Sequence, residues 1–303
     1  MAIVAFFQSM SKHQIEREKS TMKYLITGAT GNVGSRVVEL LIQSLIKPRV
    51  FVRDAHKARS LFGNRVEAFV GDLADPESLK AALKGIDEFF LVNSGPHLPL
   101  RDEAAAKAAR AAGVKHLVKL SSMDVQQGLA IGVWHEHGEA AIRAVGVPFT
   151  FVQPTGFMAN LLAWAPSIKV EGVVRASTGS GRRAYIHSGD IAAVAVKALT
   201  TRAYHGQSLP ITGPEALTFA EVTAKIGAAI RKPLRFQPIS DEEAGQRYSR
   251  ISGSAEETEA HVSLWRAIRE GRLAAVTDNV ERILGRKPIA LDQWLMENST
   301  AFQ

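Results

Sequence analysis

The chain has 303 residues, of which 46% are hydrophobic and 22% charged, a balance that excludes global disorder and collagen-like repeats. It contains no cysteine, which excludes disulfides, cysteine-ligated metals and thiol catalysis and leads us to expect a cytoplasmic protein. The 37 basic and 30 acidic residues leave a net charge of +7, which favours anionic ligands, and no apolar stretch approaches the roughly 20 residues of a membrane-spanning helix.

The first 21 residues differ from the rest of the chain. A short apolar patch over residues 2–7 precedes a polar segment over residues 9–20. A signal peptide has the opposite order, with positive charge before a longer apolar core. We therefore expect residues 1–21 to form an N-terminal arm, with the folded domain beginning at Met22.

Short apolar runs alternate with helical patterns between residues 23 and 152. The expected strands cover residues 24–27, 49–52, 66–70, 88–92, 117–121 and 149–152. The expected helices cover residues 34–46, 76–83, 101–112 and 134–145, and the first has apolar residues at Val37, Val38, Leu41, Ile42 and Leu45. This alternation predicts βαβ units and a parallel sheet covered on both faces.

The pattern is less regular after Pro154. Helices are expected over residues 189–199, 218–231 and 261–270, separated by glycines and short strands. We expect an α/β fold in which residues 22–154 form the main domain. Residues 155–303 should form a smaller lobe, with about 184–212 returning to the main domain.

A glycine loop follows the first expected strand and opens the first expected helix. Its glycines are Gly28, Gly31 and Gly34, with Thr30, Asn32 and Val33 between them. Glycines allow a tight turn and a close approach to a pyrophosphate, which the free N–H groups and the helix dipole can hold. This context predicts dinucleotide binding, although the spacing G-x-x-G-x-x-G is not the commonest form.

The end of the second strand indicates which dinucleotide binds. Arg53 stands at the tip, where a guanidinium can hold the 2′-phosphate of NADP, and Lys57 and Arg59 follow closely. Asp54 is the competing observation, because an acidic residue there would favour NAD. The alternative interpretation of Asp54 is the N-cap of the next helix. We favour NADP.

Polar and small residues follow the other strands of the expected sheet. Because ligands bind at the carboxyl ends of parallel strands, these residues are candidate cofactor contacts. They are Asp72, Leu73, Asn93, Ser94, Gly95, Ser121, Ser122 and Pro154. For Asp72 the alternative is a turn or capping residue.

Several segments together resemble the NmrA-like group of atypical short-chain dehydrogenases, most closely the branch of NADPH quinone oxidoreductases and triphenylmethane reductases. They are TGATGNVG at 27–34, VRD at 52–54, GDL at 71–73, AAGVKHLV at 111–118, the H-x-x-x-E pattern at 135–139, GVPFT at 146–150, PTGFMAN at 154–160, SGDIA at 188–192 and LPITG at 209–213. The resemblance covers roughly residues 22–290. It implies a Rossmann-type doubly wound sheet, a small C-terminal substrate lobe and NADP(H) as cofactor.

The chain departs from most short-chain dehydrogenases because it has no Tyr-x-x-x-Lys pair. The matching helix carries His135 and Glu139 instead, which share a helix face, so that the carboxylate could orient the imidazole for proton transfer. These two are our catalytic candidates, and His137 is a weaker one. Two histidines at i and i+2 do not converge, so no metal site is expected.

Candidate residues for an apolar, aromatic substrate pocket are His97, Trp134, Phe157 and Met158, of which Phe157 and Met158 have ordinary packing as an equal alternative. Such a pocket suits a flat conjugated substrate. We expect NADPH to reduce an electron-poor quinone, enone or imine, which needs little acid catalysis because the cofactor carries the difficult chemistry. The alternatives are an NADP-binding redox sensor without turnover and an NADP-dependent epimerase or isomerase. We expect a monomer or homodimer that binds neither nucleic acid nor membrane.

Overall fold

The computed structural model describes residues 22–252 and 254–303. The N-terminal arm expected over residues 1–21 lies outside the described residues. In the described part of the chain, no helix is long and apolar enough to cross a membrane.

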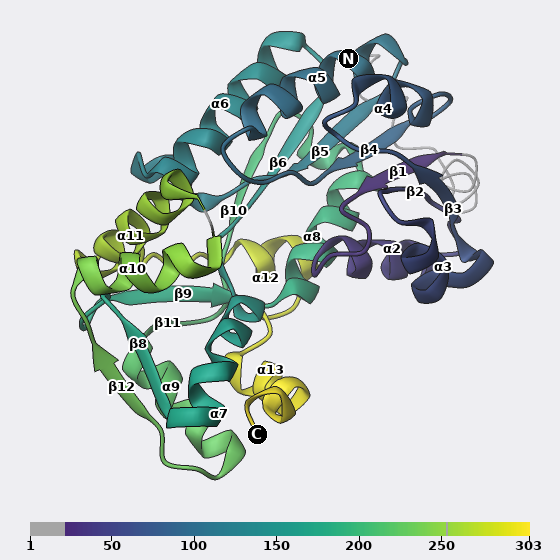
Figure 1. The fold of residues 1–303 in the computed structure, drawn as a ribbon. Helices are drawn as coiled ribbons and strands as arrows, with labels where there is room; N and C mark the ends of the chain where they lie inside the picture. Colours follow the sequence, from purple (N-terminus) through teal and green to yellow (C-terminus); the bar gives the residue numbers. More distant parts are fainter. Residues whose placement is uncertain (1–21, 253) are drawn as a thin grey trace, which may run out of the picture.

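A seven-stranded sheet forms the centre of the main domain (Figure 1). Its strands are β1 (Tyr24–Thr27), β2 (Arg49–Val52), β3 (Glu67–Val70), β4 (Glu88–Leu91), β5 (His116–Leu120), β6 (Phe149–Pro154) and β10 (Ser208–Ile211). They lie in the order β10-β6-β5-β4-β1-β2-β3, and every neighbouring pair is parallel. The chain runs from β1 outward through β2 to β3 and then crosses back through α4 to β4 on the other side of β1. The strand order reverses at this point, which is where ligands bind in such sheets, in a crevice at the carboxyl ends of the strands.

Helices cover both faces of this sheet, as the sequence predicts. One face is covered by α4 (Pro76–Ala82), α5 (Leu98–Ala111) and α6 (Ala130–Val145), and the other by α2 (Gly34–Gln43), α3 (Ala55–Phe62), α8 (Ser188–Leu199) and α12 (Asn279–Leu284). Alternate strand residues enter the two cores, so that Leu25 packs under α4 and α5 while Ile26 packs under α2 and α8. The predicted Rossmann-type α/β fold is confirmed.

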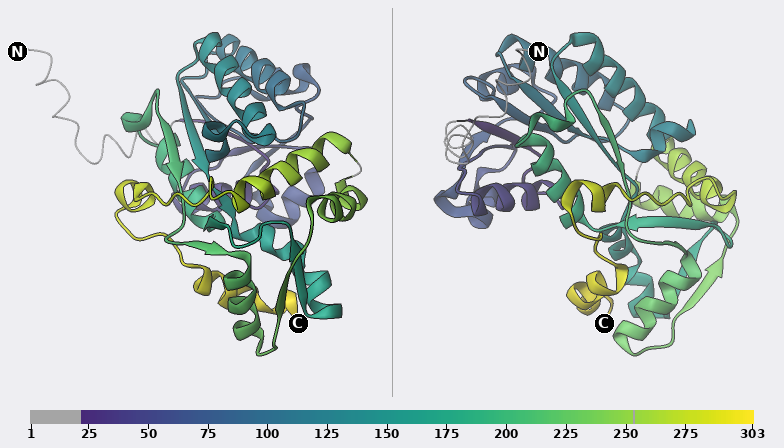
Figure 2. Two further views of the ribbon diagram at one scale, coloured as in Figure 1. Left: turned by 90° about the vertical axis from the view of Figure 1, so that its left-hand side faces the viewer. Right: turned by 180° about the vertical axis from the view of Figure 1, so that it is seen from behind.

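The C-terminal lobe contains two small sheets and five helices in the described residues. β7 (Gly156–Phe157), β9 (Arg182–Ile186) and β11 (Ala216–Thr218) form one sheet, and β8 (Val173–Ala176) pairs with β12 (Arg235–Pro238). The helices are α7 (Ala165–Glu171), α9 (Phe219–Ile230), α10 (Asp241–Ser252), α11 (Ala255–Arg269) and α13 (Leu291–Asn298). Short 3-10 helices cover Gly63–Arg65, Met123–Gln127, Met158–Trp164, Arg202–Tyr204 and Ser299–Phe302. In both views of Figure 2 the lobe lies below the main domain. The helix α11 of the lobe packs against α6 of the main domain.

The segment expected to return to the main domain is divided between the two sheets. β9 belongs to the small three-stranded sheet, whereas α8 and β10 pack with the main sheet. The chain therefore returns from the C-terminal lobe to the main domain after Ile186.

Several expected helix boundaries are wrong. The helices α6 and α11 begin four and six residues earlier than expected, and two further boundaries affect the core and the pocket. The first helix ends at Gln43, and Leu45, expected on its buried face, has a φ of 62° and is 95% exposed. The chain turns outward there, and Ile46 enters the core in its place. The helix expected to begin at residue 101 begins at Leu98, with Pro99 in its first turn, where a missing N–H costs nothing.

A buried acid–imidazole cluster lies at the opposite end of the strands from the crevice. His116 Nε2 lies 2.9 Å from Thr150 Oγ1, which donates to the Tyr204 carbonyl oxygen, so His116 Nε2 must carry a proton and donate to that hydroxyl. His116 Nδ1 then faces Glu88 Oε2 at 3.1 Å, with one proton between them. Burial raises the pKa of Glu88 to about 8 and lowers the pKa of His116 to about 4, which favours the neutral pair.

This cluster predicts a pH-dependent stability. Because the pKa of Glu88 is raised in the folded state, its contribution to the free energy of unfolding is complete at low pH and is lost as the pH rises toward 8. The free energy of unfolding falls with a slope of at most about 1.4 kcal/mol per pH unit. The lowered pKa of His116 acts in the opposite direction, but only below its ordinary value of 6.5. The free energy of unfolding should therefore fall between pH 6.5 and 8 in the wild type and stay flatter in Glu88→Gln, whose amide supplies a permanent donor. Chemical denaturation between pH 6.5 and 8 measures the free energy of unfolding of the wild type and of the variant. An equal decline in the variant would contradict the neutral, protonated state assigned to Glu88.

Candidate functional site

The glycine loop after β1 leaves no room for side chains on its inner surface. Gly28 has a φ of 60°, and a Cβ there would lie 2.9 Å from Val92 Cβ. A Cβ at Gly34 would collide with the Gly28 carbonyl group. Because α2 begins at Gly34 with no side-chain cap and no acidic residue in its first turn, the positive end of its dipole stays available to an anion. The loop therefore fits the phosphates of a dinucleotide.

A pocket of about 320 Å³ opens beside this loop at the carboxyl ends of β1 to β4. Its walls are Thr27, Gly28, Ala29, Thr30, Phe51, Val52, Arg53, Gly71, Asp72, Leu73, Val92, Asn93, Ser94 and Arg101. Seven of the predicted cofactor residues are among them. They are Gly28, Thr30, Arg53, Asp72, Leu73, Asn93 and Ser94. The pocket brings together residues that are up to 74 positions apart in the sequence, from Thr27 to Arg101.

The end of β2 presents Arg53 to this pocket and turns Asp54 away from it. The Asp54 carboxylate accepts hydrogen bonds from the backbone N–H groups of His56, at 2.8 Å, and Lys57, at 3.2 Å. Asp54 is thus the N-cap of α3, and this interpretation is confirmed. The Lys57 side chain is exposed on α3 and is not part of the pocket wall.

Asp72 combines both interpretations that the sequence allows. Its carboxylate accepts from the Ala74 N–H at 2.9 Å, as in a turn, and the residue also lines the pocket. The preceding Gly71 leaves space for the Phe51 ring, which a Cβ would strike. The exposed carboxylate of Asp72 can therefore contact a ligand while it stabilises its own turn.

The remaining predicted cofactor residues lie outside the pocket walls. Gly31 and Asn32 are exposed on the loop, and Val33 and Gly34 are buried at the start of α2. Gly95 follows β4 with a φ of 85°. Ser121, Ser122 and Pro154 lie at the ends of β5 and β6, farther along the same edge of the sheet.

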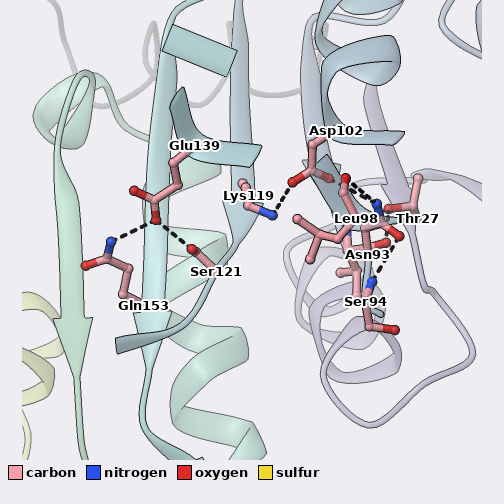
Figure 3. A network of polar contacts seen from close by, with 10 residues as sticks. Thr27, Asn93, Ser94, Leu98, Asp102, Lys119, Ser121, Glu139 and Gln153 are labelled. Carbon is pink, nitrogen blue, oxygen red and sulfur yellow. Dashed lines mark hydrogen bonds and ion pairs between the residues drawn. The ribbon is translucent and has the colours of Figure 1, made fainter. Parts of the chain in front are cut away.

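A buried ion pair supports the end of β4 (Figure 3). The ammonium of Lys119 on β5 bonds to Asp102 Oδ2 on α5, and neither side chain is exposed. Asp102 Oδ1 accepts from Asn93 Nδ2 at 3.2 Å, and Asn93 Oδ1 accepts from the Ser94 N–H at 2.9 Å. The pair thus fixes two residues that line the pocket.

A second network joins β5, α6 and β6 through the Glu139 carboxylate. The Glu139 carboxylate accepts from Ser121 Oγ at 2.5 Å, Gln153 Nε2 at 2.8 Å and Arg143 at 3.2 Å. Figure 3 shows that it points between the two strands. Its oxygens are occupied there, so Glu139 holds the strand ends together and does not orient His135.

His135 differs from the general acid that the sequence suggests. Its Nδ1 is buried and has no hydrogen-bond partner among the described residues. Burial, with a further contribution from the Lys119 charge, holds the pKa of His135 well below its usual range. The imidazole is therefore neutral at physiological pH. His137 is exposed on the outer side of α6.

The predicted substrate-pocket residues are dispersed. His97 is exposed just before α5, and Trp134 is half-buried on α6. Phe157 packs against the core of the main sheet, and Met158 is buried in the core of the lobe. The lobe still comes close to the crevice, because a Cβ at Gly95 would lie 3.7 Å from Glu257 Oε1 at the start of α11.

The sequence predictions missed Arg101, Asp102, Lys119 and Gln153. A lysine inside an otherwise apolar buried strand was a usable signal, because a buried charge needs a partner. Pro99 was a signal for the true start of α5, and hence for the position of Arg101. Within residues 22–252 and 254–303, no group of three or more His, Asp or Glu is placed to hold a metal ion.

The sequence profile of the NAD(P)H-binding family matches residues 28–202. The chain belongs to this family. The NAD(P)H azoreductase of Xenophilus azovorans is 36% identical over 283 residues, which cover 92% of this chain and 98% of the relative. The (4-alkanoyl-5-oxo-2,5-dihydrofuran-3-yl)methyl phosphate reductase of Streptomyces griseus is 39% identical over 285 residues, with coverage of 92% and 98%.

The fold is also similar to that of a solved reductase. The triphenylmethane reductase of Citrobacter sp., solved with NADP(H), superimposes with a TM-score of 0.80 over 91% of this chain and 99% of that chain, at 24% identity. The expected membership of the NmrA-like group and the expected nicotinamide dinucleotide cofactor are confirmed.

The glycine loop predicts different outcomes for two neighbouring substitutions. Gly31 is exposed, and a Cβ there meets only the Gly28 carbonyl oxygen, at 3.3 Å. We expect Gly31→Val to keep the fold and lose NADPH binding, because a branched side chain fills the space of the phosphates. Gly34→Ala should instead lower the melting temperature, because its Cβ collides with backbone. Circular dichroism and cofactor titration on each variant measure both effects, and tight binding by a folded Gly31→Val would contradict the loop assignment.

Proposed function

We propose that the protein is an NADPH-dependent reductase of small, electron-poor conjugated molecules. The observation that carries the proposal is the pocket in which the glycine loop, Arg53 and Asp72 converge. When bound, NADPH supplies the hydride. The chain supplies a cradle for the phosphates, a guanidinium at the end of β2 and a rigid edge of polar residues along β4, β5 and β6.

The preference for NADPH over NADH rests on the two side chains at the end of β2. Arg53 lines the pocket with an exposed guanidinium, which suits bidentate binding of a 2′-phosphate. Asp54, the residue that would favour the ribose hydroxyl of NADH, is engaged as the cap of α3.

The proposed acceptors share one chemistry. The azo group, the unsaturated lactone named for the Streptomyces relative and the cationic triphenylmethane dyes each contain a conjugated, electron-poor centre. Quinones, enones and imines belong to the same class. Because such acceptors need little protonation before reduction, a neutral His135 and a structural Glu139 are compatible with turnover. In this proposal His135 contributes shape and polarity, and solvent supplies the proton.

The proposal also includes a cytosolic monomer or homodimer that acts on a small molecule. The absence of cysteine fits a reducing compartment.

Turnover with a panel of acceptors tests this proposal. We expect the purified protein to oxidise NADPH in the presence of at least one quinone, enone, imine, azo compound or triphenylmethane dye, and to ignore saturated ketones. Gly31→Val is the matched control, because it should remove the activity while it leaves the fold intact. Tight NADPH binding with no oxidation by any acceptor would contradict the enzyme and support a regulatory NADP-binding protein.

A further inference from the structure

Arg101 is the one pocket-lining residue that comes from a helix on the far side of the glycine loop from Arg53. It lies in the first turn of α5, which follows β4, whereas Arg53 follows β2. Because the strands lie in the order β4-β1-β2, the two guanidiniums flank the glycine loop after β1. Both belong to the same pocket of about 320 Å³.

The Arg101 guanidinium has no internal partner among residues 22–252 and 254–303, unlike the other cations of α5. Lys107 pairs with Glu103 at 2.6 Å, and Arg110 bonds to the Val145 carbonyl oxygen. The adjacent Asp102 faces the interior, where Lys119 and Asn93 occupy its oxygens. Arg101 is half-buried and keeps its donors free at the pocket wall.

The position of Arg101 is unfavourable for helix stability. A cation in the first turn opposes the helix dipole, and α5 has neither a side-chain cap nor an acidic residue there. By contrast, α3, α4, α9 and α11 begin with side-chain caps from Asp54, Asp75, Thr218 and Ser254. An anion bound in the pocket would relieve the positive potential that Arg101 adds to the start of α5.

We propose that Arg101 binds the diphosphate of the dinucleotide and closes the pocket opposite Arg53. Arg53 lies on the β2 side of the glycine loop, where the 2′-phosphate of the ribose is expected. A cation on the β4 side therefore faces the diphosphate, which is expected over the glycine loop. The diphosphate is common to NADH and NADPH. Arg101 therefore sets the affinity for both dinucleotides, and Arg53 sets the choice between them. This inference rests on the proposed function, because it assigns a residue to the same cofactor pocket.

Titration of both cofactors against four variants tests this assignment. We expect Arg101→Ala to raise the Kd of NADPH and of NADH by the same factor, roughly tenfold to a hundredfold, and Arg101→Lys to raise both less. Arg53→Ala should weaken NADPH alone. Lys107→Ala is the matched control, because it removes the same charge from α5 at an exposed position away from the pocket. Thermal melting confirms that each variant is folded.

Each other outcome overturns the assignment. A loss confined to NADPH would mean that Arg101 recognises the 2′-phosphate, and no loss would mean that it makes no contact. An equal loss in Lys107→Ala would show a general effect of charge. If the wild-type protein binds neither cofactor, the proposed function fails together with this inference, whereas the failure of Arg101 alone leaves wild-type binding and turnover intact.

Discussion

The buried ion pair between Lys119 and Asp102 determines the geometry of the cofactor side of the sheet. An ammonium and a carboxylate without exposed surface are costly to desolvate, so the pair adds little net stability, but removal of one partner costs about 3–5 kcal/mol. The pair instead fixes the position of neighbouring residues. Asp102 holds the Asn93 amide, and Asn93 holds the backbone of Ser94, so two residues of the pocket wall are fixed from inside the protein.

Other buried polar contacts extend this rigid edge toward the lobe. Glu139 joins the ends of β5 and β6 through Ser121 and Gln153. Arg183 on β9 then pairs with Asp124, after β5, at 3.4 Å with both side chains largely buried, which ties the lobe to the main domain. These charge-assisted contacts hold the ends of β5 and β6 and the adjacent part of the lobe in place.

The sequence predicted the features that depend on local pattern. The alternation of strands and helices gave the parallel sheet, and the glycine spacing gave the loop whose Gly28 and Gly34 leave no space for a Cβ. It also offered the capping role of Asp54, which the structure confirms. These features need only neighbouring residues and general stereochemistry.

The features that were missed depend on contacts between distant residues. His135 and Glu139 share a helix face, so their spacing suggested a pair. The Glu139 carboxylate instead accepts hydrogen bonds from Ser121 and Gln153, which lie on two strands. Lys119 and Asp102 meet only because β5 packs under α5. Arg101 reaches the pocket because α5 begins one turn earlier than its apolar pattern indicates.

Transfer of deuterium from NADPH labelled at C4 of the nicotinamide tests the central claim most directly. A triphenylmethane dye or a conjugated lactone is the suitable acceptor, because the label would enter a stable C–H position and would not exchange with water. The account predicts one deuterium in the reduced product from one of the two labelled epimers of NADPH and none from the other. A reduced product without deuterium from either epimer, or bound NADPH that is never oxidised, would contradict it.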